Sequence, residues 1–129
     1  MTPEFLTVED VVEIHALQLE RFGGSAGVRD QGLLESAVAQ PQMTVGGEFV
    51  HADLFAMAAA YLFHLVQGHA FVDGNKRVGL LAALVFLDIN GISIERDSET
   101  LYELTLAVAE GRADKEEVTG VLRRVAERA

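Results

Sequence analysis

The residues best able to do chemistry are concentrated in one short stretch of this sequence. Positions 69–77 read HAFVDGNKR, which combines a histidine, an acid, a glycine, an amide and two cations. His69 can accept or give a proton near neutral pH. The carboxylate of Asp73 is a hard oxygen ligand of the kind that Mg²⁺ prefers. A base and a metal ligand beside cations indicate the transfer of a phosphoryl or nucleotidyl group.

The second half of this stretch is predicted to bind phosphate. Gly74 allows a ligand to approach the backbone because glycine has no Cβ. Asn75, Lys76 and Arg77 add side-chain donors at the start of an apolar segment that reads as a helix. The first N–H groups of a helix have no internal partners, and that end of the helix is positive. Together these groups form a cradle for an anion.

Two apolar segments must hold the stretch in place. The one before it, about residues 52–67, reads as a helix ended by Gly68, and the one after it, about 74–90, reads as a second helix stopped by Asn90 and Gly91. The apolar runs in both are shorter than the roughly 20 residues that cross a bilayer. We therefore expect two core helices joined by the polar loop, and no association with a membrane.

A purely structural interpretation of the loop stands beside the catalytic one. A histidine near a helix end, or a Lys-Arg pair after Gly-Asn, commonly has no function beyond folding or solvation. Taken one at a time, the residues of 69–77 fit that interpretation. It gives no reason, however, for so many polar groups to crowd between two core helices.

The first helix is marked by its start and its apolar side. Thr7 and Asp10 have the spacing of a capping box, and Gly23 with Gly24 ends the helix. The residues predicted to share its apolar face are Val8, Val11, Val12, His15, Leu19 and Phe22, which makes His15 a core or boundary histidine.

The remaining sequence predicts further helices with short connections. Asp30 caps a second helix that ends at Pro41, and residues 42–50 are loop-like because they contain two glycines and no helical period. A fifth helix is predicted at about 98–110, after Asp97, and a sixth at about 115–127. The whole pattern predicts an all-α fold, a compact bundle of about six helices.

Composition limits the class of protein. The 129 residues suit one domain, 1–129, with one core, and the net charge of −10 argues against direct binding to nucleic acid. The chain has no cysteine, which excludes disulfides and thiolate–zinc sites. The N-terminal residues lack the basic and apolar regions of a secretory signal, so a cytoplasmic location is expected.

The stretch 69–77 resembles the signature of the Fic/Doc superfamily, which runs His-Pro-Phe-x-x-Gly-Asn, then Gly or Lys, then Arg, with an acid just before Gly-Asn. Ala70 stands here in place of the common Pro. The similarity extends over roughly residues 6–125, and the segments 21–24, 30–35 and 86–91 are similar to the death-on-curing (Doc) toxins of that family. The matching motif positions are His69, Phe71, Asp73, Gly74, Asn75, Lys76 and Arg77.

The resemblance implies an ATP-dependent enzyme with Mg²⁺ as its cofactor. By this resemblance His69 is the catalytic base, Asp73 holds the metal, and the backbone and side chains of 74–77 bind the phosphates. Doc toxins share the lysine found at Lys76, and they phosphorylate a threonine of translation elongation factor Tu, which stops protein synthesis. A protein kinase acting on that target is the first expectation.

Two alternatives stay open at this stage. Fic enzymes that move AMP onto a hydroxyl carry Gly at the position of Lys76 and a second Arg at the position of Leu80. Both differences favour the kinase, although Gly74 is closer to the AMP-transferring pattern. The third possibility is a Fic-fold module that only binds a partner.

The resemblance also implies regulation by a second chain. Self-inhibited Fic proteins pair an inhibitory glutamate with the second Arg, which Leu80 replaces here. The nearest inhibitory pattern, from Thr44 to Glu48, contains two glycines and is not expected to be a helix. An antitoxin of the prevent-host-death type is therefore expected to dock in an apolar groove beside the loop. The acidic chain favours basic residues on that partner.

Overall fold

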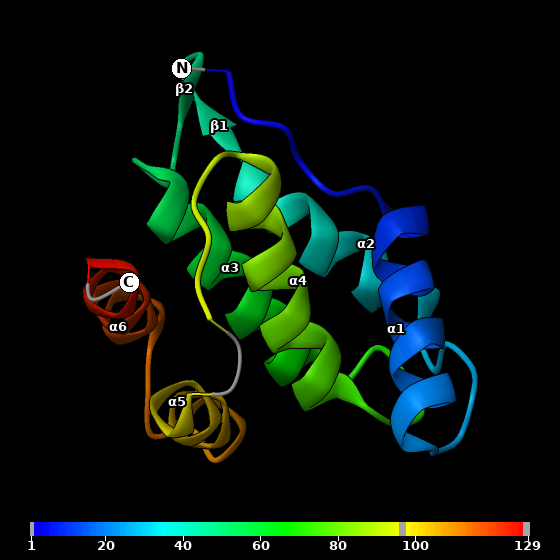
Figure 1. The fold of residues 1–129 in the computed structure, drawn as a ribbon. Helices are drawn as coiled ribbons and strands as arrows, with labels where there is room; N and C mark the ends of the chain where they lie inside the picture. Colours follow the sequence, from blue (N-terminus) through cyan, green and yellow to red (C-terminus); the bar gives the residue numbers. More distant parts are fainter. Residues whose placement is uncertain (1, 96–97, 128–129) are drawn as a thin grey trace.

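The computed structural model describes residues 2–95 and 98–127. Within these residues it is an all-α fold of six α-helices with one short 3₁₀-helix and one small hairpin (Figure 1). The all-α prediction is confirmed. The elements are α1 Val8–Phe22, α2 Gln31–Ala39, η1 Gln40–Gln42, β1 Thr44–Val45, β2 Glu48–Phe49, α3 Leu54–Gly68, α4 Asn75–Ile89, α5 Glu99–Ala109 and α6 Lys115–Glu127.

The ends of the helices follow local chemistry. Thr7 and Asp10 form the predicted capping box on α1, and Gly23, at φ 79°, ends this helix. Asp30 caps α2 by accepting the N–H of Leu33 at 3.0 Å. Asp97, the residue predicted to precede α5, lies outside the described residues, and the N-cap of α5 is Ser98.

The centre of the molecule is the pair α3 and α4. Helix α3 is buried on most sides because it packs against α2, α4, α5 and α6 (Figure 1). Gly79 of α4 lies so close to α3 that a Cβ there would come within 2.6 Å of a methyl carbon of Val66. Helices α3 and α4 are therefore the rigid core that carries the loop between them.

In the described part of the chain, no helix has the length and apolar character needed to cross a membrane.

The predicted apolar face of α1 is partly wrong. Val11 and His15 are buried as expected, but Val12 is 38% exposed and Phe22 is 55% exposed, while Ile14 is buried instead. The reason is that α1 packs mainly on α4 and α2 among the described elements, and most of its last turn is exposed. The exposed end of α1 becomes part of a groove described below.

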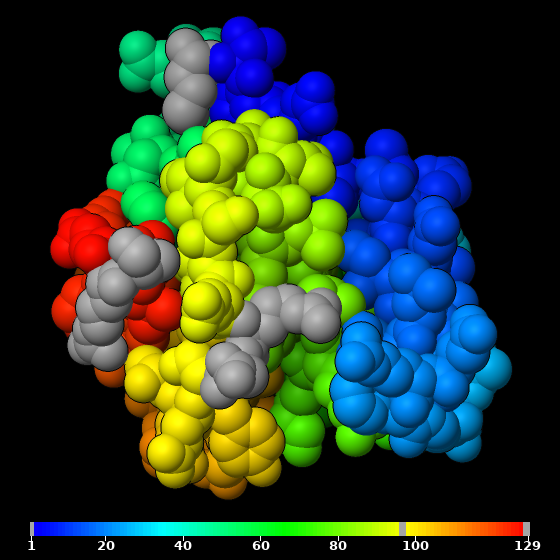
Figure 2. All heavy atoms as spheres, in the orientation of Figure 1, coloured from blue at the N-terminus to red at the C-terminus, as the bar shows by residue number. Residues whose placement is uncertain are grey.

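The stretch 42–50 is more ordered than the predicted loop. Strands β1 and β2 pair antiparallel, with Thr44 opposite Phe49, and Gly46 and Gly47 turn the chain at φ 61° and 82°. The ring of Phe49 lies 5.6 Å from that of Phe5, so the hairpin and the N-terminal segment share one end of the molecule (Figure 2). The expectation that this stretch is not an inhibitory helix is confirmed.

Candidate active site

His69 occupies the C-cap of α3 in an unusual backbone conformation. Its φ of 49° and ψ of 45° are left-handed, and it is the only residue other than glycine with positive φ among the described residues. The residue is exposed, and in the described part of the chain no group hydrogen-bonds its imidazole ring. The predicted base therefore presents both ring nitrogens to solvent or to a substrate.

The side chain of Asn75 holds the loop closed. Its Oδ1 accepts the N–H of Phe71 at 3.0 Å, and its Nδ2 donates to the carbonyl of Phe71, also at 3.0 Å. The sequence predicts that this amide faces phosphate, whereas its Oδ1 and one hydrogen of its Nδ2 are bonded to Phe71 inside the loop. The backbone N–H of Asn75, as the first of α4, and the second hydrogen of Nδ2 remain for an anion.

His15 supports the same loop from the side of α1. The ring of His15 stacks on Phe71 with 3.9 Å between centroids, and its Nε2 lies 2.8 Å from the carbonyl oxygen of Asp73. A carbonyl only accepts, so Nε2 must carry the hydrogen. Both His15 and Phe71 are buried. The prediction of a core or boundary histidine is confirmed, and its place beneath the loop is new.

The carboxylate of Asp73 is exposed and held in its ionised form. Backbone N–H groups of Ser25 and Gly74 donate to it at 3.2 and 2.8 Å, and these two bonds lower the pKa of Asp73, with Arg77 and His15 adding to the effect. The N–H of Gly74, expected to face phosphate, is therefore engaged here. Within 2–95 and 98–127 no cluster of three or more metal-ligating side chains occurs. A single carboxylate suits Mg²⁺, which usually keeps waters and shares substrate phosphates.

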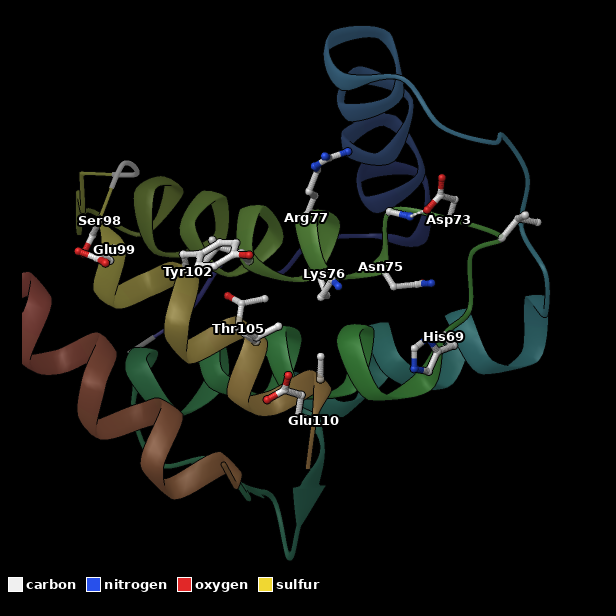
Figure 3. Close-up of a pocket in the computed structure, with 15 residues that line it drawn as sticks. His69, Asp73, Asn75, Lys76, Arg77, Ser98, Glu99, Tyr102, Thr105 and Glu110 are labelled. Atoms are coloured by element: carbon white, nitrogen blue, oxygen red, sulfur yellow. Dashed lines mark hydrogen bonds between the residues drawn. The ribbon is translucent and has the colours of Figure 1, made fainter. Parts of the chain in front are cut away.

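The loop opens onto a large cavity between α4 and α5. Its volume is about 1180 Å³, enough for a nucleotide-sized ligand. One wall is built from residues 69, 72–77 and 80, and the other from 98–99, 102, 105–106 and 109–110. Tyr102 and Thr105 of α5 face Lys76 across this space (Figure 3). The cavity is thus cationic at the loop, while the α5 wall combines an aromatic ring and apolar side chains with two acids, Glu99 and Glu110.

Arg77 lies between this cavity and a second one. Its guanidinium carbon is 4.7 Å from the ring centroid of Phe22, and the side chain reaches toward α1 in Figure 3. The second cavity, a groove of about 300 Å³ between α1 and α4, is lined by Gln18, Arg21, Phe22, Arg77, Leu80, Leu81 and Leu84. Arg77 is therefore shared by the predicted phosphate site and the groove.

Segments distant in sequence complete the loop, and the sequence patterns did not reveal them. Residues 24–30, which we call the N-terminal strap, run along the loop. The N–H of Val72 donates to Gly27 at 3.0 Å, and the N–H of Arg29 donates to Ala70 at 2.7 Å. The Nε of Arg29 also donates to the carbonyl of His69 at 2.7 Å. The only signal in the sequence was the set of glycines at 23, 24 and 27.

The other two histidines lie outside the cavity. The Nε2 of His64 is 3.1 Å from the Nζ of Lys115, and an ammonium can only donate, so His64 is neutral here. Burial, Lys115 and His51 together lower the pKa of His64 to about 4. Burial, and then Lys115, lower the pKa of His51. Neither lines the cavity, and of the four histidines in the described part of the chain only His69 does.

Fold and loop together define a class of protein, an all-helical domain in which a helix start able to bind an anion adjoins an exposed histidine. The chain belongs to the Fic/DOC family, whose model matches residues 5–87. It is 36% identical over 120 residues to "Protein kinase doc" of Escherichia phage P1, covering 93% of this chain and 94% of that protein. It is 47% identical over 94 residues to "Toxin Doc" of Mycolicibacterium smegmatis, covering 73% and 70%.

Proposed function

We propose that this protein transfers the γ-phosphoryl group of ATP to a hydroxyl of a target protein. The observation that carries the proposal is one cavity in which His69, Lys76 and the N-terminus of α4 all meet. The name of the phage P1 relative as a protein kinase supports the same reaction. Lys76 and Leu80 favour phosphoryl transfer over AMP transfer. By the resemblance, Fic enzymes that transfer AMP carry Gly and Arg at these two positions.

His69 would activate the target hydroxyl. One ring nitrogen takes the hydroxyl proton while the oxygen forms a bond to the γ-phosphorus. The bond from that phosphorus to the bridging oxygen breaks, and ADP leaves with the electron pair. General-base help of this kind contributes about 10²–10⁴-fold in rate. The exposed ring of His69 meets the requirement that a substrate hydroxyl must reach it.

Asp73 would hold Mg²⁺, which neutralises charge on the phosphate oxygens when bound. Asp73 lines the cavity, and its ionised carboxylate lies on the side of the loop that adjoins Gly24 and Ser25 of the N-terminal strap. Its backbone bonds to Ser25 and Gly74 aim it without using all of its lone pairs. Because the N–H of Gly74 is engaged, the backbone donors available to phosphate are the N–H groups of Asn75, Lys76 and Arg77, and the side chains of Lys76 and Arg77 add positive charge.

The α5 wall would hold the rest of the nucleotide. Tyr102 is 63% exposed, and Leu80 and Leu106 line the same cavity. An aromatic face beside apolar side chains suits the flat face of a purine. Phosphates at α4 and a base at α5 place the two ends of the nucleotide at opposite sides of the cavity.

The target, by resemblance to Doc toxins, is a threonine of translation elongation factor Tu. The test is incubation of the purified protein and this factor with ATP labelled at the γ or at the α phosphate. We expect label on the factor from the γ position only. Label from the α position would establish AMP transfer instead, and no label from either position would favour a binding module.

We also propose that the protein is a toxin held inactive by an antitoxin, as the name of the mycobacterial relative supports. The antitoxin, of the prevent-host-death type by resemblance, would lay a helix in the groove between α1 and α4. That groove adjoins the loop through Arg77. Its charged residues are Arg21 and Arg77. The expectation of basic residues on the antitoxin is therefore replaced by acidic ones, since local charge decides a contact more than net charge does.

Reversal of one charge in the groove tests this docking surface. Arg21→Glu should weaken antitoxin binding about 10-fold or more, because it repels an acidic helix. Co-expression of the adjacent small gene should then no longer restore growth. Arg124→Glu on the exposed side of α6 changes net charge equally and should leave rescue intact. Rescue of both variants alike would place the antitoxin elsewhere.

A further inference from the structure

The carbonyl end of α3 is the place where the predicted base leaves the helix. The last carbonyls of a helix lack internal partners and carry the negative end of its dipole. The Nε of Arg29 donates to the carbonyl of His69 at 2.7 Å, and its Nη2 to the carbonyl of Gly68 at 3.4 Å. One guanidinium from the N-terminal strap therefore caps the end of α3 at His69 itself.

His69 needs such a contact because of its backbone. A left-handed conformation is unfavourable for any residue with a Cβ, and His69 adopts it at φ 49°. The next residue is fixed as well, since the carbonyl of Ala70 accepts the N–H groups of Arg29 at 2.7 Å and of Asp30 at 3.1 Å. The backbone bonds of Arg29 and Asp30 end at Ala70, whereas the guanidinium of Arg29 bonds the carbonyls of His69 and Gly68.

We propose that Arg29 is a positioning residue that keeps His69 in its left-handed conformation and so aims the imidazole into the cavity. The assignment rests on the proposed function, because it takes His69 as the base. Arg29 does not line the cavity, so it acts on His69 rather than on the nucleotide. Its side chain is exposed, and removing it leaves the buried core intact.

The experiment compares Arg29→Ala, Arg29→Lys and the matched control Arg124→Ala, an exposed cation of α6. We expect kcat of Arg29→Ala to fall about 10-fold. Without the arginine, His69 is free to leave the left-handed conformation, which is unfavourable for a residue with a Cβ, and only a minor fraction of molecules would keep it. KM for ATP should stay within about twofold, because no nucleotide contact is removed. Arg29→Lys should recover part of kcat, since one ammonium can still bond a carbonyl, and the control should match the wild type.

A spectroscopic readout separates positioning from general stability. The Cα and Cβ chemical shifts of His69 report its φ, and in Arg29→Ala they should move away from left-handed values. A kcat per folded molecule within about twofold of the wild type would overturn the assignment. A raised KM for ATP with unchanged kcat would overturn it too, because the arginine would then act on the nucleotide.

The same spectra keep this assignment distinct from the proposed function. If the wild type transfers no label at all, the proposed reaction fails, and the chemical shifts alone decide the role of Arg29. Shifts of His69 that change in Arg29→Ala but not in Arg124→Ala would support the positioning role. Shifts that stay the same in both would overturn it.

Discussion

Replacing His69 by alanine is expected to lower phosphoryl transfer by about 10²–10⁴-fold, the usual contribution of a general base. The imidazole makes no hydrogen bond within the described residues and is exposed, so its loss removes no packing. The measurement is the rate of γ-label transfer to the target, together with the thermal midpoint of unfolding. Expression of this variant without antitoxin should leave bacterial growth unaffected.

His69→Asn is the matched control for the backbone. Asparagine adopts the left-handed conformation more readily than most residues, so this variant should keep the loop as it is and still lack the base. We expect it to be as inactive as the alanine variant. A well-folded His69→Ala protein that remains toxic and transfers label at the normal rate would remove His69 from the mechanism.

Removal of the Lys76 ammonium should have the second largest effect. Lys76 lies in the first turn of α4 and faces the cavity. A positive charge fixed beside the phosphate stabilises the negative charge that develops there in the transition state. Losing one such charge lowers the rate by about 10²–10³-fold. Lys76→Gly and Lys76→Met should both show this loss in γ-label transfer. Stability should change by about 0.5 kcal/mol or less in Lys76→Met, since the residue is exposed.

The two Lys76 variants differ in backbone freedom, which makes them informative as a pair. Lys76→Gly also loosens the start of α4 and reproduces the residue of AMP-transferring relatives. Transfer of α-label by this variant alone would show that position 76 selects the reaction. Unchanged γ-label transfer in both variants would mean that the lysine does not determine the reaction, and the preference for a kinase would lose its main support.

Local patterns predicted the elements of this protein well. The caps at Thr7 and Asp30, the two apolar helices and the loop between them all follow from side chains within a few residues of each other. The buried position of His15 was also predictable from its spacing along α1. Such features depend on interactions between residues a few positions apart, and these can be recognised directly in the sequence.

The arrangement inside the loop was not predictable in the same way. Asn75 was read as a phosphate donor, but its amide spans the loop to Phe71. Arg29 and His69 are 40 residues apart in sequence, and no periodicity or motif connects them. Phe22 was assigned to the core because its position fits a stripe, yet it borders the groove with Arg77. These outcomes depend on which helices become neighbours, and only the fold determines that.

The N-terminal strap has a consequence for the time at which activity can arise. A domain generally folds as one unit while synthesis proceeds from the N-terminus. Residues 24–30 are made before the loop 69–75, so the strap gains its backbone partners only when Ala70 and Val72 have been made. The α5 wall, which ends at Glu110, emerges later. A nascent chain that stops before this point lacks the α5 wall of the cavity, so we expect activity only after residues 99–110 have been made.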